Sequence, residues 1–122
     1  HIDFSRSKVA KIVQRGNRLV PSIVNKVCRE ANISPSEAGT LITNQPNPVF
    51  LRNWREALQI PAERHIDTFE EHGNLFGAGI PVCLDRARKE GKLGDGSYVV
   101  LGGFSHAGDY AGAAVIRWRG EA

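Results

Sequence analysis

Apolar residues recur every three or four positions in the first part of the chain, which predicts an amphipathic helix. The residues that follow this rhythm are Leu19, Val20, Ile23, Val24, Val27, Cys28 and Ala31. This spacing places them on one helix face. Because Pro21 fits either a first helical turn or a kink, we expect a broken or bent helix across residues 5–32. We expect Leu19, Ile23 and Val27 to be largely buried against a sheet.

Runs of β-branched and aromatic residues predict four strands. The run at 40–43 is short and apolar enough to be buried on both faces, and a second short strand is expected around 65–69. The runs at 97–104 and 111–118 predict a hairpin or two adjacent strands.

Two further helices are expected between these strands. Asn47 can cap a helix that has Pro48 at its first position and ends near Gln59. Another helix is predicted from about 76 to 90, with Gly91 as its stop. Strands that alternate with helices favour an α/β fold, in which helices cover a mixed sheet and the crossovers are right-handed.

Composition narrows the class of protein. The chain has 122 residues, of which 41% are hydrophobic and 24% charged, and this is typical of a folded globular domain. The net charge of +3 is spread along the chain, so we expect no nucleic-acid partner. Apolar runs are far shorter than the roughly 20 residues that cross a bilayer, so no membrane span is expected.

The cysteines and histidines do not suggest a metal site. Cys28 and Cys83 are too far apart for a disulfide framework or a zinc motif, and both lie in apolar helical patterns, so we expect two small buried side chains. The four histidines show no close ligand spacing. The sequence has no Met and begins with His1, from which we expect a fragment or a processed subunit.

Polar residues that follow strands are the natural candidates for chemistry, because ligands bind near the carboxyl ends of strands in such sheets. Three loops qualify: 44–47, 72–79 and 104–108. Each loop alone is also explained by turn, cap or exposed surface residues.

The loops taken together do resemble a known family. The matching segments are Asn44-Gln45-Pro46-Asn47, His72-Gly73-Asn74 through Ile80-Pro81, Leu84-Asp85-Arg86-Ala87, Gly91-Lys92-Leu93 and Val100 through Trp118. Their order and spacing resemble the C-terminal half of β-ketoacyl-acyl carrier protein synthase III, a thiolase-fold family. The resemblance implies that residues 1–122 form the C-terminal half of a thiolase-like fold. It also implies that the N-terminal half, which carries the nucleophilic Cys, is absent from this chain.

The resemblance also implies which residues are catalytic. Asn74 matches the family's Asn in its Gly-Asn motif, whereas Asn44 occupies the position of the family's His. An amide donates and accepts hydrogen bonds but cannot serve as a base near neutral pH. His106 lies in the segment that aligns with the family's glycine-rich turn, and we hypothesise that it supplies the missing base. Gly108 in the same turn and Asn47 are expected to bind substrate.

The implied function is acyl transfer from an acyl carrier protein or CoA thioester to a carbon, hydroxyl or amine acceptor, in fatty acid or polyketide biosynthesis. No resident cofactor is expected, since the phosphopantetheine thioester is the substrate. Arg52 and Arg55 are expected to dock the acidic carrier protein. A cytoplasmic homodimer of the full protein is implied, active only when the two halves are assembled. The alternative is a degenerate, non-catalytic subunit that pairs with an active ketosynthase.

Overall fold

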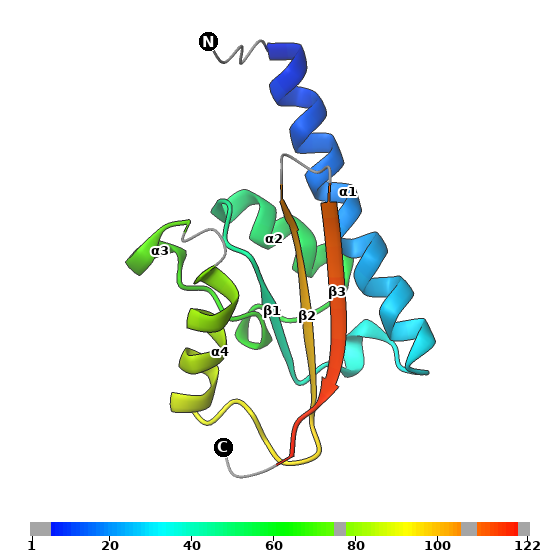
Figure 1. Ribbon diagram of the computed structural model, residues 1–122, viewed down its shortest axis with the longest axis vertical. Coiled ribbons are helices and arrows are strands. Elements are labelled where there is room, and N and C mark those ends of the chain that lie inside the picture. Colours follow the sequence, from blue (N-terminus) through cyan, green and yellow to red (C-terminus); the bar gives the residue numbers. More distant parts are fainter. Residues whose placement is uncertain (1–5, 75–77, 106–109, 120–122) are drawn as a thin grey trace.

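A mixed sheet of three strands lies at the centre of the computed structural model, which describes residues 6–74, 78–105 and 110–119 (Figure 1). β1 (Thr40–Thr43) runs parallel to the central strand β2 (Tyr98–Ser105), and β2 pairs antiparallel with β3 (Tyr110–Arg117). The predicted mixed sheet is therefore confirmed, together with the strand at 40–43 and the paired strands at the end of the chain.

One face of the sheet is covered by α1 (Arg6–Glu30) and α2 (Pro48–Ala57). We call it the α1–α2 face. Its buried core consists of Val20, Val24, Cys28, Ile33, Ala38, Leu41, Phe50, Leu51, Trp54, Leu58, Ile60 and Val100. α1 comes so close to the sheet that a Cβ atom on Gly102 would stand 2.8 Å from Cγ2 of Val24. Only a glycine in β2 leaves room for this approach.

α1 differs from the sequence prediction in two ways. It is one continuous helix that includes Pro21, so of the two expected forms, broken or bent, the broken one is excluded. Its fully buried row is Val20, Val24 and Cys28, whereas the row expected to be buried, Leu19, Ile23 and Val27, is only half-buried. Neighbouring rows share one apolar stripe, and the row that faces the sheet is the one whose Val20 and Val24 lie against Gly102.

α2 begins as predicted. Oδ1 of Asn47 accepts a hydrogen bond from the backbone N–H of Phe50 at 2.8 Å, and Pro48 takes the first helical position. Trp54 lies among Phe50 and Phe104, with ring centroids 5.6 to 5.7 Å apart. Its Nε1–H donates to the carbonyl oxygen of Gly16 in α1 at 2.9 Å. This aromatic cluster joins α1, α2 and the end of β2.

The other face of the sheet, which we call the α4 face, is covered by α4 (Gly79–Lys89). Its buried core consists of Ile42, Ile66, Cys83, Ala87, Leu93 and Val99. All four residues of β1 are buried, as the sequence predicted, because Leu41 points to one core and Ile42 to the other. α4 ends as predicted before Gly91, whose φ is +70°.

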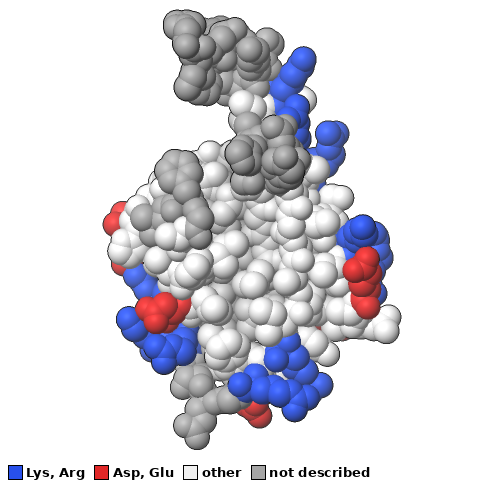
Figure 2. All heavy atoms as spheres, viewed as in Figure 1, with Lys and Arg blue, Asp and Glu red and all other residues white. Residues whose placement is uncertain are grey.

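α4 packs against β1 and leaves the β2–β3 side of this face open (Figure 1). Ile116 of β3 is 39% exposed, and a Cβ atom on Gly112 would meet nothing within 4 Å. Figure 2 shows that charged side chains lie around the rim of this side of the molecule and leave its centre uncharged. In the described part of the chain, no helix is both long and apolar enough to span a membrane.

The segment between α2 and α4 is not the strand predicted at 65–69. η2 (Ala62–Arg64) is followed by a single bridge between His65 and Leu41, and α3 (Phe69–His72) then begins. The turn starts early because the carboxylate of Asp67 accepts the backbone N–H of Phe69 at 3.0 Å. A further short helix, η1 (Pro35–Glu37), precedes β1.

Candidate active site

Asn44 follows β1 directly, and its amide pairs with the backbone of Phe104 in β2. Nδ2 donates to the carbonyl oxygen of Phe104 at 3.1 Å, and the backbone N–H of Phe104 donates to Oδ1 at 3.2 Å. A Cβ atom on Gly103 would lie 2.9 Å from Oδ1, so the glycine makes room for the amide. The side chain thus extends the β1–β2 pairing by one step and holds the two strand ends together.

Gln45, the next residue, holds the same loop in place through hydrogen bonds of its side chain. It is fully buried, and its Nε2 donates to the carbonyl oxygens of Thr43 and Ile66, each at 3.2 Å. Its Oε1 accepts the backbone N–H of Thr68 at 3.0 Å. These bonds tie β1 to the segment that leads into α3. No sequence signal marks Gln45 as a site residue, because an amide gains this role only from the groups that surround it once it is buried.

Asn74 lies in the link between α3 and α4. It is half-buried and follows Gly73, whose φ of +65° suits a glycine. The link ends at Gly79, where a Cβ atom would lie 3.8 Å from the backbone nitrogen of Gln45 and 4.0 Å from Cα of Asn44. The start of α4 therefore lies against the Asn44 loop, so the ends of β1 and β2 and the start of α4 meet at one edge of the sheet.

The other expected site residues are more scattered. Asn47 uses its side-chain oxygen to cap α2. Arg52 is exposed and Arg55 half-buried, and both belong to α2, the helix that follows the Asn44 loop. His106 and Gly108 lie outside the described residues.

His65 is a buried polar residue that sequence analysis did not single out. Its Nε2 lies 3.0 Å from Oγ1 of Thr43, while its Nδ1 is buried with no hydrogen-bond partner. Burial lowers the pKa of His65 to about 4, and the charge of Arg55 contributes in the same direction. The ring is therefore neutral near pH 7.

Both cysteines are buried and free, as predicted. Burial raises the pKa of Cys28, and the charge of Glu37 acts in the same direction. Burial also raises the pKa of Cys83, whose Sγ lies 3.6 Å from Oγ1 of Thr68. Neither thiol is an activated nucleophile near pH 7. Among the described residues, no group of three or more His, Cys, Asp and Glu could hold a metal ion.

Comparisons with known proteins identify the family. The family model described as 3-oxoacyl-[acyl-carrier-protein] synthase III C terminal matches residues 28–118. The chain therefore belongs to this family, and its fold is the C-terminal part of a thiolase-like fold, as the sequence motifs predicted.

Two curated relatives are β-ketoacyl-[acyl-carrier-protein] synthases III. The protein of Synechocystis sp. is 36% identical over 99 residues, which is 81% of this chain and 30% of the relative. The protein of Porphyra umbilicalis is 38% identical over 100 residues, 82% of this chain and 30% of the relative. The chain thus spans less than a third of the length of these relatives.

A solved structure agrees with these relatives. The crystal structure of 3-oxoacyl-(acyl carrier protein) synthase III from Pseudomonas aeruginosa superposes with a TM-score of 0.84 at 28% sequence identity. The superposition covers 99% of this chain and 39% of that one.

Proposed function

We propose that this chain is the C-terminal part of an acyltransferase of the synthase III type. It would move an acyl group from an acyl carrier protein or CoA thioester to a carbon, hydroxyl or amine acceptor, in fatty acid or polyketide biosynthesis. The observation that carries the proposal is the meeting of three chain segments at one sheet edge, where Asn44 is bonded to Phe104 beside the start of α4.

In the proposed reaction the nucleophile comes from an N-terminal half that packs on the open side of the α4 face. Its cysteine sulfur attacks the thioester carbon, and the carrier thiol leaves with a proton. The acceptor then attacks the acyl carbon, the bond between that carbon and the cysteine sulfur breaks, and the proton that the acceptor loses returns to the sulfur. No resident cofactor is required, since the phosphopantetheine arm belongs to the substrate.

The two asparagines would act on the thioester oxygen. The NH₂ group of Asn44 has two hydrogens, of which one is bonded to the carbonyl oxygen of Phe104. The other is left to donate to the oxygen as negative charge develops on it. Asn74 is proposed to be a second donor. Donors held in place in this way lower the barrier, because they need not reorient during the reaction.

The step that tests this proposal is acyl-enzyme formation. The full-length protein, incubated with acetyl-CoA or with malonyl-CoA in separate samples, should gain the mass of one acyl group. Peptide mapping should place the adduct on a cysteine outside residues 1–122, because Cys28 and Cys83 are buried and protonated. An adduct on either of these thiols, or no adduct with any acyl donor, would contradict the proposal.

Docking of the carrier protein is proposed at α2. Arg52 and Arg55 lie on the helix that follows the Asn44 loop, and acyl carrier proteins are acidic. Reversing both charges should slow acylation by the carrier protein in a salt-dependent way and leave acylation by CoA thioesters unchanged. Equal effects on both donors would remove the two arginines from the docking surface.

His106 remains the proposed base. If it takes the acceptor's proton, His106→Gln should reduce turnover about 10²- to 10⁴-fold, while acylation by the donor thioester stays intact. A change of less than about twofold would leave Asn44 and Asn74 to act by hydrogen bonding alone.

A second candidate function is a non-catalytic subunit that pairs with an active ketosynthase. It is favoured by the amide of Asn44, which stands in place of the family's histidine and bonds to the backbone through both its polar atoms. The absence of a cysteine at the nucleophile position of the N-terminal half, together with co-purification of an active relative, would support it. The homodimer and the cytoplasmic location are proposed with the first function.

A further inference from the structure

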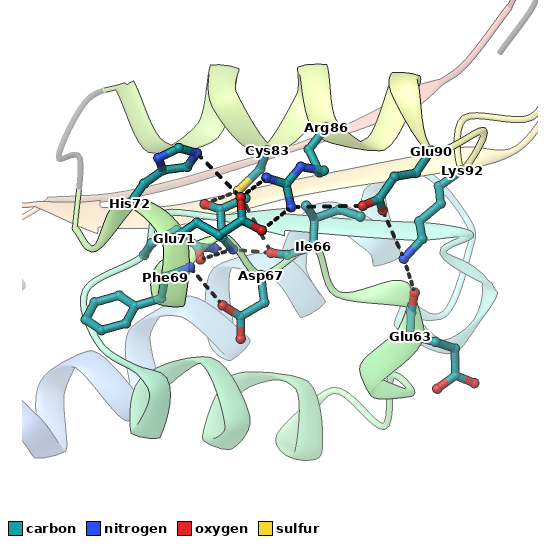
Figure 3. A network of polar contacts seen from close by, with 12 residues as sticks. Glu63, Ile66, Asp67, Phe69, Glu71, His72, Cys83, Arg86, Glu90 and Lys92 are labelled. Carbon is teal, nitrogen blue, oxygen red and sulfur yellow. Dashed lines mark hydrogen bonds and ion pairs between the residues drawn. The ribbon is translucent and has the colours of Figure 1, made fainter.

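A chain of charged side chains connects α3 to α4 and to the start of the following loop (Figure 3). The guanidinium of Arg86 forms a bidentate pair with the carboxylate of Glu71. Nη1 donates to Oε1 at 3.0 Å, and Nη2 donates to Oε2. Glu90 lies 4.0 Å from Nη1 of Arg86, and Nζ of Lys92 lies 3.6 Å from Glu90. Lys92 also donates to the carbonyl oxygen of Glu63 at 3.2 Å.

The Glu71–Arg86 pair spans the link that carries Asn74. Glu71 is three residues before Asn74, and Arg86 lies in the last turn of α4. α3 has only four residues, and a helix this short is not stable by itself. Its orientation therefore depends on contacts made by its side chains and by the residues around it.

The described contacts anchor the link at its two ends. At the start, the backbone N–H of Thr68 is bonded to Gln45, and Oγ1 of Thr68 lies beside Sγ of Cys83. At the far end, Gly79 lies against the Asn44 loop. Among the described residues, the contact of Glu71 with Arg86 is a side-chain bond that joins α3 to α4 directly.

An ion pair of this kind fixes an orientation more than it adds stability. The side chain of Arg86 is 27% exposed and that of Glu71 is 56% exposed, so water screens their attraction. A guanidinium bound through two nitrogens still permits only one arrangement of the carboxylate. The hydrogen bonds and charge of Arg86 also lower the pKa of Glu71, so the carboxylate stays ionised near pH 7.

We propose that Glu71 and Arg86 are positioning residues that hold Asn74 in its reactive orientation. This inference rests on the proposed function, in which Asn74 donates to the thioester oxygen. A displacement of about 1 Å at a reacting group can reduce turnover about 10²-fold, so a surface pair that contributes little stability can still have a large effect on rate.

The experiment uses the full-length protein with acetyl-CoA and malonyl-CoA together, so that one thioester supplies the acyl group and the other accepts it. Arg86→Gln and Glu71→Gln should each lower kcat about tenfold or more, with KM changed by less than about twofold and Tm by less than about 2 °C. The double variant Glu71→Arg with Arg86→Glu exchanges the two charges, and its kcat should be at least about fivefold higher than that of either single variant. Arg88→Gln is the matched control, because Arg88 pairs with Asp85 on the exposed side of the same helix, and it should leave kcat unchanged.

Two further results separate this inference from the proposed function. Asn74→Ala should lower kcat more than Arg86→Gln does, and if it has no effect, the catalytic role of Asn74 fails. If Asn74→Ala is slow and Arg86→Gln turns over normally, only the positioning role is overturned. The positioning role is also overturned if Arg86→Gln loses activity only in proportion to the fraction of unfolded protein, or if the kcat of the double variant is no higher than that of either single variant.

Discussion

The two faces of the sheet are built differently. The α1–α2 face is closed by large side chains, among them the aromatic cluster of Phe50, Trp54 and Phe104. The α4 face has a smaller core that stops before β3, where Ile116 remains partly exposed. Asn44 lies on this second face, beside Gly103. The candidate chemistry is therefore on the face that this chain leaves incomplete, whereas the complete face supports the strands from behind.

The largest expected effect on stability comes from the loss of Trp54 on the α1–α2 face, which is the closed face of the sheet, whereas the α4 face is the open one. Trp54→Ala removes a fully buried ring and its hydrogen bond to Gly16, and should lower the free energy of unfolding by about 3–5 kcal/mol. Ile116→Ala on the open face should lower it by less than about 1 kcal/mol. Urea unfolding of the 122-residue chain measures both, and similar values would mean that the two faces do not differ in packing.

The second effect concerns His65, at the edge where the two faces meet. Its pKa is about 4 in the folded chain and near 6.5 when unfolded, so the unfolded chain takes up the proton first as the pH falls. The contribution of His65 to the free energy of unfolding is therefore fully present above about pH 6.5. It falls by about 3 kcal/mol as the pH decreases towards 4.

Urea unfolding at a series of pH values measures this decline. His65→Gln should remove this part of the pH dependence, at the expense of a lower stability at pH 7. His72→Gln is the matched control, because His72 is exposed on α3 and its loss should leave the decline in place. An unchanged profile in His65→Gln would assign the decline to other groups.

A third comparison uses glycines on opposite faces. Gly102→Ala places a methyl group 2.8 Å from Val24 on the closed face and should destabilise the chain by about 1–3 kcal/mol. Gly112→Ala meets open space in this chain and should have almost no effect. If the N-terminal half covers this position, Gly112→Ala should destabilise the full-length protein but not the 122-residue chain. Equal effects in both proteins would argue that the half packs elsewhere.

The smallest expected effect on stability is a charge on the open face. Because the centre of this face is uncharged (Figure 2), the chain is expected to associate in solution. Ile116→Lys should shift the chain towards monomer on a sizing column, with a change in the free energy of unfolding below about 0.5 kcal/mol. A wild-type chain that is already a monomer at high concentration would contradict this view of the open face.

Local patterns predicted the elements well where one interaction dominates. The cap of Asn47 and the stop at Gly91 follow from backbone chemistry within a few residues, and the structure confirms both. The strand expected at 65–69 is wrong because the carboxylate of Asp67 accepts the backbone N–H of Phe69 and starts a local turn. The buried row of α1 was also misassigned, since both rows are apolar and the periodicity does not separate them.

The site shows the same division. Family motifs, which are short and local in the sequence, predict Asn44 and Asn74 as site residues. They do not predict the setting of these residues, because Asn44 bonds to a backbone 60 residues further along the chain, and Arg86 contacts Glu71 from another helix. Gln45 and His65 have no sequence signal of their own, since an amide or an imidazole gains its role from the groups that surround it once it is buried.

The sequence by itself determined the positions of the three longer helices and of the three paired strands, the alternation of β1 between two cores and the family to which the chain belongs. These depend on periodicity and on motifs, which are properties of neighbouring residues. Only the tertiary structure decided which row of α1 faces the sheet, which face stays open, and what holds Asn44 and the link around Asn74. Those outcomes depend on the fit of surfaces far apart in the sequence, such as the close approach of Val24 to Gly102.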